Sequence, residues 1–518
     1  MSPSEAATAI TGGGAPRARP RSPATGALWR AAKRFLYVFH RWTGIVLCLF
    51  FAVWFVSGVV MMYVPFPSFR ASERIAGAAP IDWARVRVAP DAALARLHES
   101  AFPEEMRLGM SGQVPVYHIV TEDGRRAVSA ETGQEIRAVD TRQAGAIAAA
   151  FVGAPVASTA AVSQDQWVVT RAYKKIAPFW RVRLTDPAAT DVYVVQRTGE
   201  IVQNTTADER FWNWLGAVPH WIYFEALRVF QEPWRQTVLW TSGVGLLGAI
   251  AGIWIGLLRV RLAKRYKSGS VSPYRGWMKW HHVIGLVGGL FVVTWVFSGW
   301  LSMSPWGGLR DEDKGVAERY AGTGPGFAAT DLRRLAATAG AARELEFRYL
   351  DGMPVIVAWH DPERKSLLDG ATGEPLALPQ DRIAAIARAA VTDGRLVRVQ
   401  RLERYDSYWY ATGDPRRDAR PLPVLRLVFD DPAETWLHVD PATGTLLART
   451  GSGGRSYRWL FAALHSFDLP FLLENRWLRD LLMWLFSAAG LAVSISGVVI
   501  GWRRLRPPAK ALRAPGGA

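Results

Sequence analysis

Four uninterrupted apolar stretches restrict what this chain can fold into. None of them contains Asp, Glu, Lys or Arg, and they run from Trp42 to Val64, Val238 to Leu258, Val283 to Met303 and Leu481 to Trp502. A helix needs about 20 residues to cross the hydrocarbon core of a bilayer. The sequence therefore predicts four transmembrane helices, with a lipid bilayer as the first partner of the chain.

The net charge of +17 is concentrated in three short segments that flank these stretches. Residues 1–41 carry seven Lys or Arg and one acid, residues 259–279 carry seven and none, and residues 503–518 carry five and none. Short basic segments beside membrane helices stay in the cytoplasm. This topology explains the charge without nucleic acid as a partner. It predicts a bacterial inner-membrane protein with both termini in the cytoplasm.

The first apolar stretch is expected to remain in the protein as a helix. It is longer than the core of a secretory signal, which has about 7–15 apolar residues. No small-x-small cleavage motif follows it, because the next residues are Tyr63-Val64-Pro65-Phe66-Pro67. The only cysteine, Cys48, lies inside this stretch, so we expect no disulfide in the parts outside the membrane.

The chain repeats itself. The segment HRWTGIVLCLFFAVWFVSGVVMM begins at His40, and HHVIGLVGGLFVVTWVFSGWLSM begins at His281. RFWNWLGAVPH ends at His220, and RSYRWLFAALH ends at His465. Further aligned pairs are Gly44 with Gly285, Ser57-Gly58 with Ser298-Gly299, and Gly252 with Gly497. Corresponding helices cross the membrane in the same direction, so the repeat predicts two parallel halves about a pseudo-twofold axis along the membrane normal.

The long intervals between the apolar stretches show strand and turn signals. Four Thr-Gly turns each adjoin strand-like runs, at Thr132-Gly133, Thr198-Gly199, Thr372-Gly373 and Thr443-Gly444. The predicted fold class is an α-helical membrane protein with α+β extracytoplasmic domains, each made of two small units. The predicted segments are a basic tail (1–34), a first helix (35–64), a periplasmic domain (65–233), a second helix (234–259), a basic loop (260–276), a third helix (277–304), a second periplasmic domain (305–476), a fourth helix (477–503) and a tail (504–518).

Four histidines occupy equivalent positions in the two halves. His40 and His281, the inner pair, begin the first and third helices, and His220 and His465, the outer pair, precede the second and fourth. Ionisable groups at membrane depth are costly, which makes a functional role the default hypothesis. Haem iron has two axial positions that imidazole fills. One haem between the histidines of each pair is therefore predicted, against structural or proton-handling roles as the alternative.

His282 is the alternative inner ligand, because it adjoins His281 and a change of helix register would exchange the two. No Cys-x-x-Cys-His motif is present, so both haems are expected to be haem b. No nucleotide-binding loop is evident either. The electron donor is therefore expected to be external, either a quinol or a cytoplasmic reductase.

The histidine-led first and third helices, the two segments that end at His220 and His465, and the Thr-Gly hairpins resemble the PepSY-associated transmembrane-helix family over about residues 33–506. Members of this family are often described as iron-regulated membrane proteins and include FoxB-type ferric-siderophore reductases. The resemblance implies a dihaem b-type protein with periplasmic PepSY domains that reduces siderophore-bound iron. It also implies that His40, His220, His281 and His465 are the haem ligands.

Three functions follow from these features. The first is a haem-dependent ferric-siderophore reductase that carries electrons across the membrane, with no single catalytic residue identified. The second is a non-enzymatic PepSY module that binds a periplasmic peptide, protease or signalling partner. The third is a transporter, which the repeat favours and the lack of carboxylates in the membrane stretches disfavours.

Overall fold

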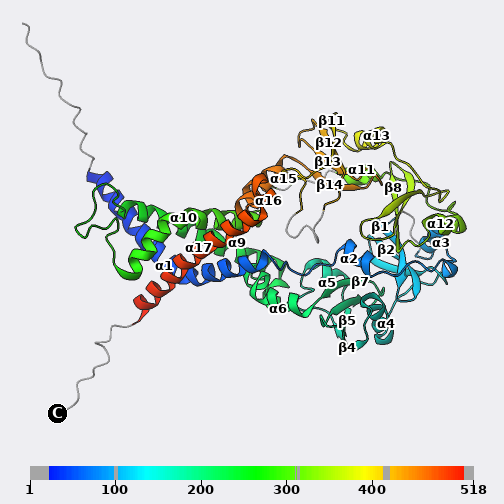
Figure 1. Cartoon of the computed structure of the whole chain (residues 1–518), viewed down its shortest axis with the longest axis horizontal. Coiled ribbons are helices and arrows are strands. Elements are labelled where there is room, and N and C mark those ends of the chain that lie inside the picture. Colours follow the sequence, from blue (N-terminus) through cyan, green and yellow to red (C-terminus); the bar gives the residue numbers. More distant parts are fainter. Residues whose placement is uncertain are drawn as a thin grey trace, which may run out of the picture.

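The computed structural model describes residues 23–97, 103–307, 309, 311, 315–411 and 420–506. Most of the predicted terminal tails lies outside these residues. In the described part, a bundle of long helices continues at one end into a head of strands and short helices, formed by residues 62–230 and 303–475 (Figure 1).

Four helices of the bundle are long and apolar enough to cross a membrane: α1 (Pro23–Met61), α9 (Gln231–Arg259), α10 (Gly276–Ser302) and α17 (Arg476–Leu505). The protein is a multi-pass membrane protein, as predicted. Large apolar side chains such as Leu49, Leu247 and Val287 are exposed on the helix surfaces, as expected for side chains that face lipid.

The helices of the bundle are arranged in a square. α1 packs against α9 and α17, and α10 packs against the same two helices. α1 and α10 therefore face each other across the centre of the bundle. The start of α1, the end of α17 and the connection between α9 and α10 all lie at the end away from the head (Figure 1).

The head contains three antiparallel sheets. Their orders are β10-β9-β8-β1-β2-β3, β4-β5-β6-β7 and β11-β12-β13-β14. The strands are β1 (Glu105–Ser111), β2 (Val114–Thr121), β3 (Gly124–Ser129), β4 (Val156–Val162), β5 (Phe179–Leu184), β6 (Asp191–Val195), β7 (Ile201–Thr205), β8 (Glu344–Leu350), β9 (Met353–Trp359), β10 (Lys365–Asp369), β11 (Leu396–Leu402), β12 (Val424–Phe429), β13 (Trp436–Val439) and β14 (Leu446–Thr450).

Short helices cover the sheets and connect them to the bundle. In the first half they are α2 (Ala71–Gly77), α3 (Pro90–Ala95), α4 (Thr141–Val152), α5 (Arg171–Ile176), α6 (Ala207–Leu215), α7 (Ala217–His220) and α8 (Glu225–Arg228). In the second half they are α11 (Val316–Ala321), α12 (Leu332–Ala339), α13 (Gln380–Ala390), α15 (Ser452–Tyr457), a π-helical turn (Arg458–Ala463) and α16 (Pro470–Glu474).

The Thr-Gly turns form as predicted. Gly133, Gly199, Gly373 and Gly444 all have φ between 68° and 73°, which is the left-handed region that glycine adopts at low cost. Each half contributes two groups of strands with accompanying short helices. One feature was not predicted: β1 from the first half pairs with β8 from the second, so one continuous six-stranded sheet joins the halves.

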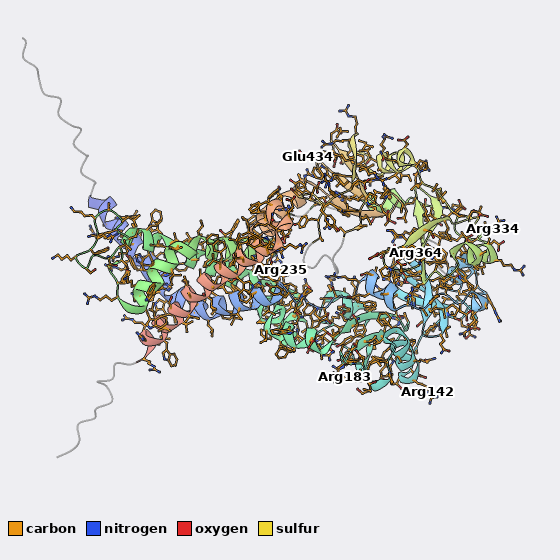
Figure 2. All side chains as sticks on the ribbon, in the orientation of Figure 1. Arg142, Arg183, Arg235, Arg334, Arg364 and Glu434 are labelled. Carbon is orange, nitrogen blue, oxygen red and sulfur yellow. The ribbon has the colours of Figure 1, made fainter. Side chains whose placement is uncertain are left out.

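The head and the bundle are joined at one end of the long helices (Figure 1). Arg235, in the first turns of α9, lies at this junction (Figure 2). Its guanidinium donates hydrogen bonds of 3.4 Å and 3.3 Å to the carbonyl oxygens of Met303 and Ser304. The end of α10 is thereby tied to the start of α9.

Candidate functional site

The outer pair lies where the head meets the bundle. His220 ends α7, and His465 follows the π-helical turn. Their ring centres are 6.2 Å apart, with the planes inclined by 73°. Each Nδ1 is 3.0 Å from a serine hydroxyl, Ser57 for His220 and Ser298 for His465. The carbonyl oxygen of Trp54 also lies 3.2 Å from His220 Nδ1.

Different local structures bring these two histidines to equivalent places. Before His220 the chain breaks at Gly216, which separates α6 from α7. A Cβ at Gly216 would lie 3.0 Å from Val60 Cγ1 on α1, so a larger residue would require Val60 to shift. Before His465 the chain instead widens into the π-helical turn, a feature often found at functional sites.

The inner pair lies across the bundle, toward the end away from the head. The ring centres of His40 on α1 and His281 on α10 are 6.3 Å apart. Nδ1 of His40 is 2.9 Å from the carbonyl oxygen of Gly248. Nδ1 of His281 is 2.9 Å from the hydroxyl of Ser496 and 3.2 Å from the carbonyl oxygen of Val493. Gly248 and Val493 are aligned in the repeat.

Both pairs fit a bis-histidine metal ligand set. Two imidazoles bound to one metal through Nε2 have ring centres about 6 Å apart, from about 2 Å per metal–nitrogen bond and about 1 Å within each ring. The observed separations agree with this value. Ligand histidines also hold their second nitrogen with a carbonyl or another polar group, which fixes the ring. All four Nδ1 atoms have such partners here, and Nε2 has none among the described residues.

His282 does not share this geometry. Its Nδ1 is 2.9 Å from the hydroxyl of Ser272, and its Nε2 is 3.0 Å from the carbonyl oxygen of Gly256. Tyr274 packs edge-on against the ring. Both nitrogens therefore have protein partners, and this buried side chain tethers the α9–α10 connection to the end of α9. A metal at His282 would require the loss of one of these hydrogen bonds.

Each of the four candidate ligands lies against a glycine of a long helix. A Cβ added at Gly252 would lie 2.5 Å from His40 Cε1, and one added at Gly58 would lie 3.2 Å from His220 Cε1. The aligned glycines of the second half make the same contacts less closely, Gly497 with His281 at 3.6 Å and Gly299 with His465 at 3.5 Å.

A cavity of about 650 Å³ adjoins the outer pair, within the range of about 300–1,000 Å³ that is usual for small-molecule and cofactor sites. Trp54 and Trp295, aligned in the repeat, form part of its wall, and the Nε1 of each is buried without a partner among the described residues. Arg479 and Asp468 also line it, with 3.5 Å between Nη1 and Oδ1. The other lining residues include four methionines, Met61, Met62, Met303 and Met483.

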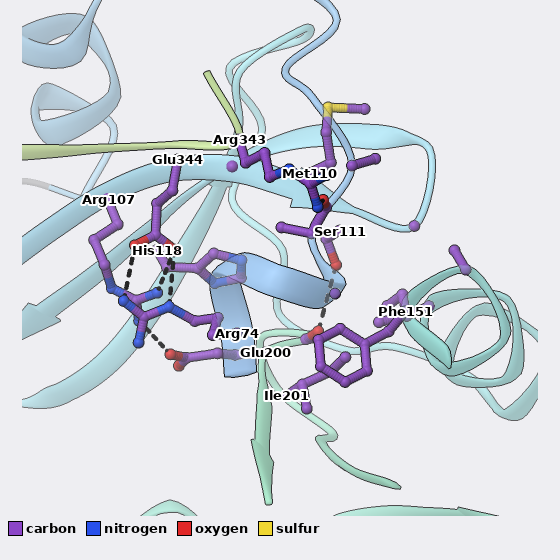
Figure 3. Close-up of a pocket in the computed structure, with 18 of the residues that line it drawn as sticks. Arg74, Arg107, Met110, Ser111, His118, Phe151, Glu200, Ile201, Arg343 and Glu344 are labelled. Carbon is purple, nitrogen blue, oxygen red and sulfur yellow. Dashed lines mark hydrogen bonds and ion pairs between the residues drawn. The ribbon is translucent and has the colours of Figure 1, made fainter. Parts of the chain in front are cut away.

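A second group of charged side chains lies in the head (Figure 3). Arg107 on β1 is buried and contacts Glu200, just before β7, and Glu344, at the start of β8. Burial opposes the charged form of Glu200, but Arg107, His118 and neighbouring Arg125 lower its pKa to about 2. Burial also lowers the pKa of His118 to about 4.

The pocket beside this cluster holds only about 70 Å³. Its charges are already paired within the protein, because Glu344 also accepts hydrogen bonds of 2.8 Å from Arg74. The cluster joins β1, β7, β8 and α2, which come from both halves of the chain. We interpret it as the connection that holds the head together.

The described residues contain no group of three or more His, Cys, Asp and Glu side chains arranged to hold a metal ion. The candidate sites are therefore histidine pairs, which match the two axial positions of a haem better than a metal ion held by the protein alone. Sequence reasoning aligned Ser57 with Ser298 but assigned them no role. Their exact spacing from the helix-leading histidines, 17 residues in both halves, was the available signal.

These features define a multi-pass membrane protein with a β-sheet head and two facing histidine pairs. A family model described as the PepSY-associated TM region matches residues 39–372, and the chain belongs to this family. The family predicted from the sequence is thereby confirmed. No curated protein and no solved structure matches the chain.

Proposed function

We propose that this protein is a transmembrane electron-transfer protein of the bacterial inner membrane, with one haem b between the histidines of each pair, and that it reduces a ferric siderophore in the periplasm. The separation of the ring centres, 6.3 Å and 6.2 Å, is the observation that carries the proposal. When bound, haem supplies one-electron chemistry. The two pairs lie toward opposite ends of the bundle, as transfer across a membrane requires.

The side chains around each pair have defined tasks in this proposal. Ser57 and Ser298 fix the outer imidazoles through Nδ1, and the carbonyl oxygen of Gly248 fixes His40. Such outer partners keep Nε2 directed at the metal and make the imidazole a better ligand. Most residues that line the outer cavity are apolar, and the polarity around a haem influences its reduction potential. Arg479, which also contacts Asp468 and Asp480, would be a basic partner for the haem carboxylates.

The orientation of the protein in the membrane is part of the same proposal. The basic segments at residues 259–279 and 503–506 lie at the end of the bundle away from the head, which supports cytoplasmic termini and a periplasmic head. The aligned contacts of the two halves support a pseudo-twofold axis along the bundle. Electrons would enter from a quinol or a cytoplasmic reductase near the inner pair. One electron converts Fe(III) in the siderophore to Fe(II), whose complex is weaker.

The proposal is tested by anaerobic mixing of the reduced, purified protein with a ferric hydroxamate in the presence of an Fe(II)-specific dye. We expect one Fe(II) per electron delivered, together with reoxidation of the haem bands. His220→Ala and His465→Ala should each lose one haem and Fe(II) production. His360→Ala is the matched control, because His360 lies in the head and hydrogen-bonds Ser366.

Two outcomes would contradict the proposal. Equal Fe(II) production by the wild type, both outer variants and a protein-free blank would show that the outer pair has no role in reduction. A wild-type protein without haem would exclude the electron-transfer function and favour the alternative, a PepSY module that binds a periplasmic peptide, protease or signalling partner.

A further inference from the structure

Two glycines of the bundle have no packing partner that explains them. Gly44 on α1 and Gly285 on α10 are aligned in the repeat and lie within the helices. A Cβ added at Gly285 would meet no atom within 4 Å. One added at Gly44 would meet only Cys48 Sγ, at 3.9 Å and one turn further along the same helix.

Other glycines of the bundle, on α9 and α17, are explained by close contacts. A Cβ at Gly490 would lie 2.3 Å from the ring of Phe55, and one at Gly256 would lie 2.8 Å from Leu286 Cδ2. Such contacts are the usual reason for small residues between membrane helices. Glycine weakens a helix interior relative to alanine. Gly285, which faces open space, and the aligned Gly44, whose nearest neighbour is on its own helix, therefore call for a different reason. Close approach of a ligand to the backbone is one.

These glycines lie close to the inner histidine pair. Gly44 follows His40 by four residues, and Gly285 follows His281 by four. Residues four apart lie on the same face of a helix, about 6 Å along its axis. The two imidazoles face each other across the bundle centre with Nδ1 anchored, so the glycines face the same interior space. Both glycines and both histidines are only partly buried, as expected around an open space.

We propose that Gly44 and Gly285 form the seat of the inner macrocycle, a slot in which a planar tetrapyrrole lies against bare backbone on both sides. The inference rests on the proposed function and adds two positioning residues to it. A tetrapyrrole centred between the two rings would be wider than one helical turn, so its edge would reach residue i+4 on each helix.

Substitution of these glycines by leucine tests the proposal. Gly44→Leu and Gly285→Leu should each lower the haem content of the purified protein from two per chain to one, and the remaining haem should keep the spectrum of the outer site. Retention of the outer haem also reports that the protein has folded. Val287→Leu is the matched control, because Val287 lies two residues from Gly285 and is 75% exposed on the outer surface of the bundle. It should keep both haems.

Alanine variants test the same placement of Gly44 and Gly285 if the leucine variants do not fold. A methyl group at Gly44 and Gly285 should shift the midpoint potential or EPR signal of one haem and leave those of the other unchanged. Two haems per chain in the double leucine variant, or unchanged potentials and signals for both haems in the double alanine variant, would overturn the inference alone. A wild-type protein without haem would overturn the proposed function, which is a distinguishable result.

Discussion

Replacement of Arg107 by methionine should open the sheet that joins the two halves of the head. The Arg107 side chain is 4% exposed, and its partners Glu200 and Glu344 are 7% and 6% exposed. Removal of one partner from a buried ion pair costs about 3–5 kcal/mol, because a charge is left buried without compensation. Arg125 and Arg74 still contact the two carboxylates at 2.7 Å and 2.8 Å. The lower value, about 3 kcal/mol, is therefore expected.

Hydrogen exchange measured by mass spectrometry reports this opening locally. A loss of about 3 kcal/mol corresponds to roughly 100-fold faster exchange in peptides that contain the paired residues Met106–Leu108 and Leu345–Phe347. Arg401→Met is the control, because the Arg401–Glu403 pair is exposed by 51% and 64% and should contribute at most about 1 kcal/mol. Equal exchange in Arg107→Met and Arg401→Met would refute the reasoning.

Three further predictions concern the ligands, the topology and the response to pH. His281→Ala should lose one haem, whereas His282→Ala should keep both haems and loosen the α9–α10 connection. A loss of haem in His282→Ala alone would contradict this assignment. A reporter active only in the periplasm should work after Ala89 or Gly340 and fail after Lys267, and activity at Lys267 would exclude the topology. The pKa of His118 is about 4 in the folded protein and about 6.5 in the unfolded chain. The free energy of unfolding of the head should therefore decrease by up to about 1.4 kcal/mol per pH unit as the pH falls from 6.5 to 4. It should decrease further toward pH 2 as Glu200 protonates. His118→Gln should remove the first phase in thermal unfolding curves, and an unchanged pH profile would contradict its assignment.

The bundle and the family were predictable from the sequence for physical reasons. A helix in lipid must be apolar over its whole length, so the four stretches alone predicted α1, α9, α10 and α17. The histidine pairs were visible because the repeat aligned His40 with His281 and His220 with His465. The repeat thus singled out these four positions, and their role as haem ligands is part of the proposed function.

Other features depend on contacts between distant segments, which local patterns do not encode. The pairing of β1 with β8 joins strands more than 230 residues apart. The sequence pattern of either strand would be the same if it were the edge strand of a separate sheet. The difference between His281 and His282 depends on acceptors at Ser496, Ser272 and Gly256, which only the folded chain brings near. The break at Gly216 replaces a π-helical turn in the aligned segment, so similar sequences here form different backbones.

The haem content of the purified wild-type protein tests the central claim most directly. A pyridine haemochrome assay on protein from haem-replete cells, combined with a reduced-minus-oxidised spectrum, gives the number and type of haems per chain. The account predicts two haems b per chain, both low-spin, with one lost in each single variant of the four histidines. A colourless protein, or a haem content unchanged by substitution of His40, His220, His281 and His465, would contradict it.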